Sequence, residues 1–150
     1  MLQIIRTNSD NADFTELVNQ LDAYLRVVDG DDHAFYAQYN KTGTLNYVVM
    51  AYENDLAVGC GALREFNNDA IEIKRMYIIP EKRNRGIAKA ILLELETWAH
   101  ELGFNKCILE TEKVQADAVA LYSKSGYNVI ANYGQYEKIE TSICFEKELQ

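Results

Sequence analysis

No apolar run in the 150-residue sequence approaches 18 residues, and this lack excludes a helix that spans a membrane. The first six residues are too few and too polar for a signal peptide. The cysteines are odd in number, isolated and set in apolar segments; they are Cys60, Cys107 and Cys144. Such cysteines are typical of reduced core residues, so we expect a cytoplasmic protein. Repeats, low-complexity tracts and linkers are also lacking, and residues 1–150 are therefore expected to form a single domain.

Several signatures of nucleotide and metal sites are missing as well. The dinucleotide fingerprint G-x-G-x-x-G and the P-loop G-x-x-x-x-G-K-[ST] are both absent. So are H-E-x-x-H, paired cysteines and the nucleophile elbow, and the two histidines lack metal-ligand spacing. An EF-hand loop that began at Asp29 would need Gly and Glu where Ala34 and Asn40 stand. We therefore expect no metal site, and Asp29 to Asp32 indicates a helix break.

The most informative stretch is a strand, a basic loop and a long helix in succession. The strand covers Ile71–Ile79 and ends at Pro80, the only proline, while the helix covers Ile87–Leu102 and ends before Gly103. The first amides of a helix have no intrahelical partner, and the helix dipole makes that end partly positive. Because Gly86 lets the backbone approach an anion closely, the loop is predicted to bind a phosphorylated ligand.

The distribution of charge supports an anion site at this loop. From Lys74 to Lys89 the sequence carries six cations and one anion, Glu81, in a chain of net charge −8. The six cations are Lys74, Arg75, Lys82, Arg83, Arg85 and Lys89. Their clustering in an acidic protein favours a compact polyanion over a chance group of solvated side chains. The patch is too small, and its surroundings too acidic, for a nucleic-acid footprint, so no nucleic-acid partner is expected.

Hydrophobic spacing places the other elements along the chain. Strands are expected at Leu2–Arg6, Leu45–Tyr52, Leu56–Phe66, Lys106–Glu110 and Ile139–Leu149. Helices are expected at Phe14–Val28, His33–Tyr39 and Val114–Lys124. A three-strand antiparallel meander then leads into the basic loop and long helix, and the next strand returns parallel through a right-handed crossover. In the long helix, Glu96 is expected on the polar face.

The loop matches the pattern Arg/Gln-x-x-Gly-x-Gly/Ala over Arg83–Ala88. With the strand Glu72–Pro80, it resembles the acetyl-CoA-binding core of the GCN5-related N-acetyltransferase (GNAT) superfamily. The segment Ala118–Tyr127 is similar to the second block of that family, in which Ala and Leu-Tyr precede a Gly-Phe pair. Gln115 stands where many members have Asn, and Ala88 replaces the last Gly, a variation that the motif allows. The resemblance implies an α/β (mixed α+β) fold with a central mixed, mostly antiparallel sheet of about seven strands flanked by about four helices.

The same resemblance implies acetyl-CoA, and therefore coenzyme A, as the cofactor. Backbone amides from Arg83 to Lys89 would hold its pyrophosphate, a task that needs no particular side chain beyond Gly86. The pantetheine arm would lie along Met76–Ile78 like an extra strand, where a backbone amide would polarise the thioester carbonyl. The implied cofactor-binding residues are Met76, Tyr77, Ile78, Arg83, Asn84, Arg85, Gly86, Ile87, Ala88, Lys89 and Gln115.

Two side chains are candidates for the proton transfers of acyl transfer. The resemblance makes Tyr122 the general acid near the departing sulfur, because a tyrosine of pKa about 10 can donate to a thiolate whose conjugate acid has a pKa of about 8 to 9. Glu72 is the candidate general base, since it lies eleven residues before the loop motif, the spacing of the base glutamate in the histone-acetyltransferase branch. On a regular strand Glu72 shares one face with Lys74, Met76 and Ile78.

Each catalytic candidate has a structural alternative. Tyr122 is also the kind of aromatic that packs a helix against a core. Glu72 is alternatively an ordinary strand carboxylate paired with Lys74 or Arg64. The rival carboxylates for the role of base, at the end of the fifth strand, are Glu110 and Glu112.

The acceptor pocket is expected from two regions that members of the family use. One is the loop before the last strand, which holds Tyr133 and Tyr136, and the other is the early helices, which hold Asp32, His33 and Tyr36. Aromatic rings combined with carboxylates suit a cationic amine. Packing at the rim of the site is the alternative role for each tyrosine.

These features predict an acetyl-CoA-dependent N-acetyltransferase that moves the acetyl group to a primary amine by direct attack in a ternary complex. Direct attack is favoured because no cysteine is placed to carry the acetyl group covalently. The acceptor is a small-molecule or protein amine, and the frequency of dimers in the family leaves a homodimer open. The alternative is a non-catalytic domain of the same fold that binds CoA as a sensor or regulator, or that serves as an interaction module.

Overall fold

The computed structural model describes residues 1–30 and 43–150. Its strands are β1 (Leu2–Thr7), β2 (Tyr47–Glu53), β3 (Leu56–Glu65), β4 (Ala70–Ile78), β5 (Lys106–Glu112), β6 (Asn128–Ile130) and β7 (Ser142–Glu148). Its α-helices are α1 (Ala12–Asp29), α3 (Ile87–Glu101) and α4 (Ala116–Lys124). Within the described residues there are thus three α-helices, where about four were expected. The predicted helix His33–Tyr39 lies outside the described residues. No described helix is both long enough and apolar enough to cross a membrane.

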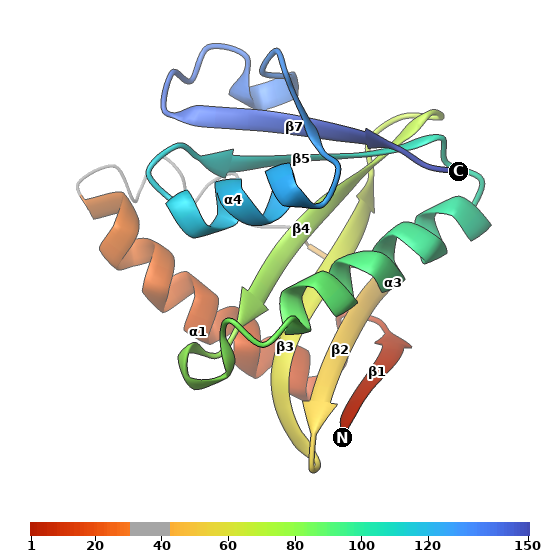
Figure 1. Ribbon diagram of the computed structural model, residues 1–150, viewed down its shortest axis with the longest axis vertical. Coiled ribbons are helices and arrows are strands. Elements are labelled where there is room, and N and C mark those ends of the chain that lie inside the picture. Colours follow the sequence, from red (N-terminus) through yellow and green to blue (C-terminus); the bar gives the residue numbers. More distant parts are fainter. Residues whose placement is uncertain (31–42) are drawn as a thin grey trace.

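All seven strands form one mixed sheet, in the order β1-β2-β3-β4-β5-β7-β6. The predicted meander β2-β3-β4 is antiparallel, and β5 joins β4 in parallel, so both of these predictions are confirmed. Helices α3 and α4 cover one face of the sheet and α1 packs against the other (Figure 1). The short strand β6 was not placed by the hydrophobic spacing, because only three residues pair with β7.

Helix α1 begins and ends with ordinary capping interactions. The Asn11 side chain accepts hydrogen bonds from the amides of Asp13 (2.9 Å) and Phe14 (3.1 Å), which satisfies two donors of the first turn. At the other end Gly30 adopts a positive φ of 56°, and its N–H bonds to the carbonyl of Arg26. The buried residues Phe14, Leu17 and Leu21 pack α1 along β3 and β4, and the last turn of α1 reaches the site described below.

The expected polar face of α3 is wrong at one position. Glu96 is only 8% exposed, although it was expected to face solvent. Its carboxylate accepts hydrogen bonds from the Tyr127 hydroxyl (2.8 Å) and from the Lys147 ammonium (2.9 Å). These two donors come from the segment after α4 and from β7, which cover this flank of the helix. The two hydrogen bonds offset the cost of burying a charge that helical periodicity alone would leave exposed.

A β-bulge in β4 changes which side chains face which side of the sheet. Cys60 of β3 pairs with Tyr77, and Ala62 pairs with Lys74, so Arg75 and Met76 together lie opposite a single residue of β3. Arg75 has a φ of 59°, which is unusual for a residue other than glycine. The extra residue reverses the alternation of side chains along the rest of the strand.

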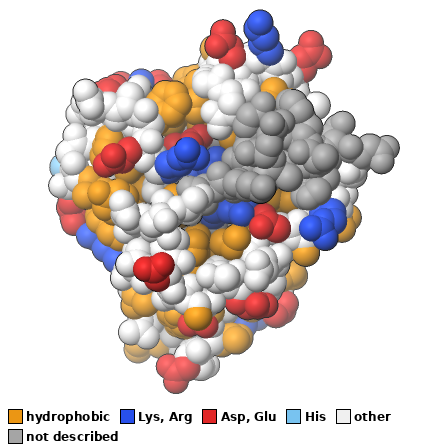
Figure 2. Space-filling view, turned by 180° about the vertical axis from the view of Figure 1, so that it is seen from behind, with side chains coloured by type: hydrophobic (Ala, Val, Ile, Leu, Met, Phe, Trp, Pro, Cys, Tyr) orange, Lys and Arg blue, Asp and Glu red, His pale blue; other side chains and the backbone are white. Residues whose placement is uncertain are grey.

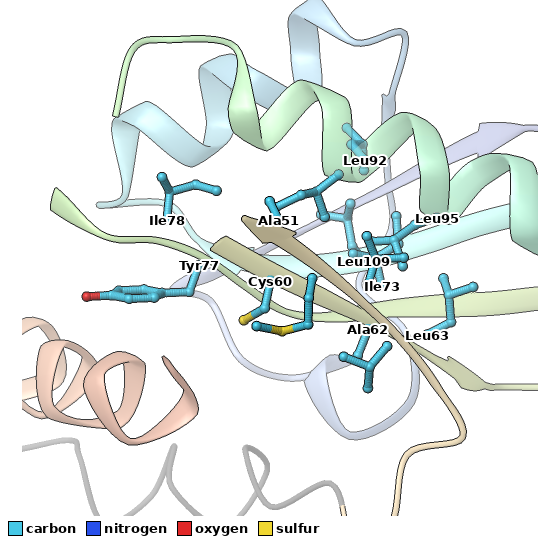
Figure 3. Packing of buried hydrophobic residues seen from close by; sticks show 14 of the residues in the cluster. Ala51, Cys60, Ala62, Leu63, Ile73, Tyr77, Ile78, Leu92, Leu95 and Leu109 are labelled. Carbon is cyan, nitrogen blue, oxygen red and sulfur yellow. The ribbon is translucent and has the colours of Figure 1, made fainter. Parts of the chain in front are cut away.

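The predicted shared face of Glu72, Lys74, Met76 and Ile78 is therefore wrong. Met76 and Ile78 pack toward α3, whereas Glu72 and Lys74 lie on the face that carries α1. Figure 3 shows Ile78 on the side of α3 and Tyr77 pointing toward α1. The prediction failed because it assumed strict alternation of side chains along β4 and did not allow for the extra residue of the bulge.

Two glycines of β3 make room for the bulge and for α3. A Cβ atom on Gly59 would lie 2.5 Å from Ile78 Cδ1, which is too short, and 3.2 Å from the Tyr77 carbonyl oxygen, which is tighter than an ordinary contact. We expect Gly59→Ala to lower the free energy of unfolding by about 1–3 kcal/mol through overpacking. Urea unfolding at neutral pH measures this difference. A change below about 0.5 kcal/mol would contradict the close fit of β3, β4 and α3.

Candidate active site

The site begins where β4 and β5 separate. The two strands pair only from Ala70↔Lys106 to Glu72↔Ile108 and then diverge, as Figure 1 shows. Beyond Glu72, β4 has no strand partner on this side among the described residues. Its outward backbone groups, apart from the Ile78 carbonyl, which accepts a hydrogen bond from Arg83 Nε, are therefore available to an extended ligand that binds like a strand.

A cavity of about 140 Å³ lies between the separated strands. Its lining combines a polar wall with apolar residues of α1 and α4. The lining residues are Leu21, Leu25, Asp29, Glu72, Ile73, Lys74, Arg75, Met76, Glu110, Thr111, Glu112, Gln115, Ala118, Tyr122 and Tyr136. Among the predicted site residues, the structure thus brings together Glu72, Met76, Gln115, Tyr122 and Tyr136. Leu21, Leu25, Asp29 and Ala118 were not predicted, because nothing in the sequence relates α1 to the second block of the motif.

The loop between β4 and α3 presents backbone amides at the mouth of this gap. Asn84 and Gly86 have positive φ values of 64° and 81°, which turn the chain sharply before α3 begins at Ile87. No side chain caps the first turn of α3. A Cβ on Gly86 would meet no atom within 4 Å, so the space in front of the helix is open. This geometry is suited to bind an anionic group through backbone donors.

The six cations between Lys74 and Lys89 do not form one cluster in the structure. Lys74 and Arg75 line the cavity rather than the loop. Lys82 pairs with Glu53 at 2.5 Å. The Arg83 side chain folds back, because its Nε donates to the Ile78 carbonyl (2.9 Å). Its guanidinium lies 5.6 Å from the ring centres of both Tyr24 and Tyr77.

Arg85 and Lys89 have no ion pair or hydrogen bond to another side chain within the part of the chain that the structure describes. They are thus the loop cations most readily available to a ligand. Figure 2 shows the face opposite to that of Figure 1, where Lys and Arg side chains are interspersed with Asp and Glu side chains.

Tyr122 lies on the side of α4 that faces the cavity. Its ring makes an edge contact with Tyr127 (5.7 Å between centroids) and a tilted contact with Phe145 (6.0 Å). Burial raises the pKa of Tyr122 well above its ordinary value, so its hydroxyl keeps its proton at physiological pH. The residue therefore packs the helix and also presents a protonated group to the cavity.

Glu72 lies at the point where the two strands part, and it is 5% exposed. Its Oε2 accepts a hydrogen bond of 2.6 Å from the Tyr133 hydroxyl. Its Oε1 lies 3.9 Å from Lys74 Nζ, which in turn lies 3.3 Å from the Tyr136 hydroxyl. Burial lowers the pKa of Lys74, while the charges of Glu72 and Glu110 oppose this effect. Glu72 thus has a lysine neighbour and still lines the cavity.

The rival carboxylates lie across the gap on β5. Glu110 accepts a hydrogen bond from the Ser142 hydroxyl, and burial raises the pKa of Glu110 above its usual range. Burial, a hydrogen bond with Asp29 and the charges of Asp29 and Glu110 raise the pKa of Glu112 to about 8. One feature of the sequence could have pointed to Asp29. It is a carboxylate in the last turn of α1, where the helix dipole disfavours a negative charge.

The elevated pKa of Glu112 predicts how stability depends on pH. From about pH 4.5, its ordinary value, to about pH 8 the folded chain holds a proton that the unfolded chain releases. This contribution to stability is therefore complete below about pH 4.5 and is lost as the pH rises to about 8. Relative to wild type, the free energy of unfolding of Glu112→Gln should rise by roughly 1–2 kcal/mol between pH 5 and pH 8.5, after allowance for solvent screening.

Urea unfolding at both pH values tests this prediction, with the exposed Glu137→Gln as control. Equal pH slopes for Glu112→Gln and wild type would contradict the prediction.

Several predicted residues contribute in other ways or lie outside the described residues. Tyr77 and Ile78 turn their side chains away from the gap, so only their backbone atoms can contact a ligand there. Tyr133 contacts Glu72 and is not itself part of the cavity wall. The predicted acceptor residues outside the described residues are Asp32, His33 and Tyr36. Within residues 1–30 and 43–150, no group of His, Cys, Asp and Glu side chains could hold a metal ion.

Comparison with known proteins identifies the family of this chain. The family model described as "Acetyltransferase (GNAT) family" matches residues 12–127. The uncharacterized N-acetyltransferase YjgM of Escherichia coli is 34% identical over 106 residues, a match that covers 69% of this chain and 63%, less than two thirds, of YjgM. The IAA acetyltransferase of Azospirillum brasilense is 30% identical over 141 residues, which cover 89% of each chain.

Solved structures share the whole fold. A Klebsiella pneumoniae protein, described provisionally as an acyl-CoA N-acyltransferase, superimposes with a TM-score of 0.83 at 27% identity and covers 100% of this chain and 99% of its own. A GNAT family acetyltransferase from Elizabethkingia anophelis, solved with acetyl-CoA bound, has a TM-score of 0.71 at 17% identity and covers 99% of this chain and 98% of its own. This chain therefore belongs to the GNAT family of acetyltransferases, acyltransferases whose cofactor is acetyl-CoA.

Proposed function

We propose that this chain transfers an acetyl group from acetyl-CoA to a primary amine by direct attack in a ternary complex. The observation that carries the proposal is the cavity between β4 and β5. The free edge of β4, the protonated side chain of Tyr122 and the buried carboxylate of Glu72 all border this cavity. These are the groups that acyl transfer from a thioester to an amine requires.

The loop and the strand edge would hold the cofactor. Backbone amides from Arg83 to Lys89 would bind the pyrophosphate, with Arg85 and Lys89 as the cations nearest to it. The free edge of β4 at Met76–Ile78 would pair with the pantetheine arm, and Gln115 would contact the arm from the other wall. A backbone N–H of this edge would stabilise negative charge on the thioester oxygen during attack.

Glu72 would accept a proton from the amine, and Tyr122 would donate a proton to the leaving sulfur. An amine of pKa about 10 arrives protonated, so Glu72 would take its proton and leave the nitrogen lone pair free to attack the carbonyl carbon. As the carbon–sulfur bond breaks, Tyr122 would donate its proton to the sulfur. The attacking nitrogen would lose a second proton to solvent as the amide forms, so the products are an N-acetylated amine and CoA thiol. Glu72 would then release the proton that it took and Tyr122 would regain one from solvent, with a net release of one proton.

The charge of the cavity wall favours a cationic acceptor. The cavity wall holds the carboxyl groups of Asp29, Glu72 and Glu110, together with that of Glu112, which keeps its proton at neutral pH because its pKa is raised to about 8. Two cations, Lys74 and Arg75, also line the wall. Arg75 is also paired with Asp22 at 3.0 Å. An ammonium group would therefore be attracted into this wall before it loses its proton.

A screen of amines with acetyl-CoA tests the proposed function. Polyamines, amino acids, aminoglycosides and lysine peptides would be incubated with the chain, and released CoA thiol would be measured. Release that depends on one class of amine and yields its N-acetyl product is the expected result. Binding of acetyl-CoA without thiol release for any class would contradict catalysis and would instead indicate a CoA-binding sensor.

A further inference from the structure

The loop between β6 and β7 holds a tyrosine hydroxyl directly on Glu72. Tyr133 Oη donates to Glu72 Oε2 at 2.6 Å, a short hydrogen bond to a carboxylate. Burial and the nearby Glu72 charge raise the pKa of Tyr133 well above its ordinary value. The tyrosine therefore stays protonated and acts as the donor in this pair.

The Tyr133 ring is itself held on two sides. Phe66 makes an edge contact with it at 5.2 Å and 75°, and Tyr136 makes another at 5.8 Å and 89°. The loop backbone is also fixed, because Asn132 Nδ2 donates to the carbonyls of Ile139 (2.9 Å) and Ser142 (3.2 Å). The direction of the hydroxyl is thus determined by packing and by the backbone rather than by a free rotamer.

The second oxygen of Glu72 is placed differently. Oε1 lies 3.9 Å from Lys74 Nζ, beyond hydrogen-bond distance, and Glu72 lines the cavity. A carboxylate has two acceptor oxygens, so engagement of Oε2 by Tyr133 leaves Oε1 able to accept a proton from an amine. One oxygen fixes the orientation of the group, and the other remains available for proton transfer.

We infer that Tyr133 is a positioning residue that orients the Glu72 carboxylate for proton abstraction, rather than a residue that contacts the acceptor. This inference rests on the proposed role of Glu72 as the base. Proton transfer needs the acceptor oxygen to be held about 3 Å from the amine nitrogen, and a freely rotating carboxylate meets this condition only part of the time.

The test is a double-mutant cycle between Tyr133→Phe and Glu72→Gln in the full chain. Tyr133→Phe keeps the ring but removes the donor, and is expected to lower kcat about 10-fold or more while KM for acetyl-CoA is unchanged. In the Glu72→Gln background the same substitution should have no further effect on kcat. Tyr52→Phe is the matched control, since it removes another tyrosine hydroxyl from a carboxylate, that of Asp13, outside the cavity. Its kcat should equal that of wild type.

Equal losses in both backgrounds, or an unchanged kcat for Tyr133→Phe, would overturn the inference. If Glu72→Gln itself keeps full kcat, the proposed base is wrong, and the inference falls with it for that separate reason. A readout without turnover distinguishes these cases: the Tyr133 hydroxyl proton should give a downfield proton NMR signal that Tyr133→Phe removes and Glu72→Gln shifts. A wild-type spectrum without that signal would overturn the inference even in a chain that turns over no amine.

Discussion

Glu72→Gln is expected to lower kcat by about 10²- to 10⁴-fold, because the amide cannot take a proton from the incoming ammonium. The substitution keeps the shape of a side chain that is 5% exposed, and Gln can still accept the hydrogen bond from Tyr133. Acetyl-CoA should therefore bind with unchanged affinity, since its proposed contacts lie on the loop and the β4 backbone. Steady-state kinetics at saturating amine, together with calorimetric titration of acetyl-CoA, measure both quantities.

The two carboxylates across the gap provide the matched comparison. Glu110→Gln and Glu112→Gln make the same chemical change on β5, and both residues line the same cavity. Both variants should lose less than 10-fold in kcat at neutral pH if Glu110 only attracts the cationic acceptor and Glu112 keeps its proton. A larger loss for Glu110→Gln than for Glu72→Gln would assign the base to Glu110.

Tyr122→Phe is expected to lower kcat by about 10²-fold through loss of the proton that Tyr122 donates to the leaving sulfur. The ring contacts with Tyr127 and Phe145 are retained, so thermal stability should change little. Because burial raises the pKa of Tyr122, wild-type kcat should show no loss of this acid up to about pH 10. Kinetics from pH 6 to 10 and thermal unfolding of both proteins test the assignment. An unchanged kcat in the variant would leave Tyr122 only its packing role.

The sequence was sufficient for the parts of the fold with strong local signals. Gly86 and Gly103 marked the two ends of the long helix, and hydrophobic spacing predicted the strands of the meander. The bulge at Arg75 was not predictable, because a residue other than glycine with positive φ leaves no mark in composition or period. As a result the face of Met76 was predicted wrongly.

Contacts between distant segments were the other limit. The contact of Tyr133 with Glu72 joins residues 61 positions apart, and helical periodicity gave no reason to expect Glu96 below the surface. The proximity of Asp29 to Glu112 likewise depends on how α1 crosses the sheet. Such pairs follow from tertiary packing, which local propensity does not encode.

The most direct test of the account is a thermal shift with acetyl-CoA, CoA and NADH in parallel. A ligand at about 100 times its dissociation constant stabilises the folded chain by roughly 2.7 kcal/mol, which raises the melting temperature of a domain this size by several degrees. The gap between β4 and β5 and the loop at Gly86 predict a shift with acetyl-CoA and CoA but none with NADH. No shift with either CoA compound would contradict a working cofactor site at this loop, and with it the proposed acetyl transfer.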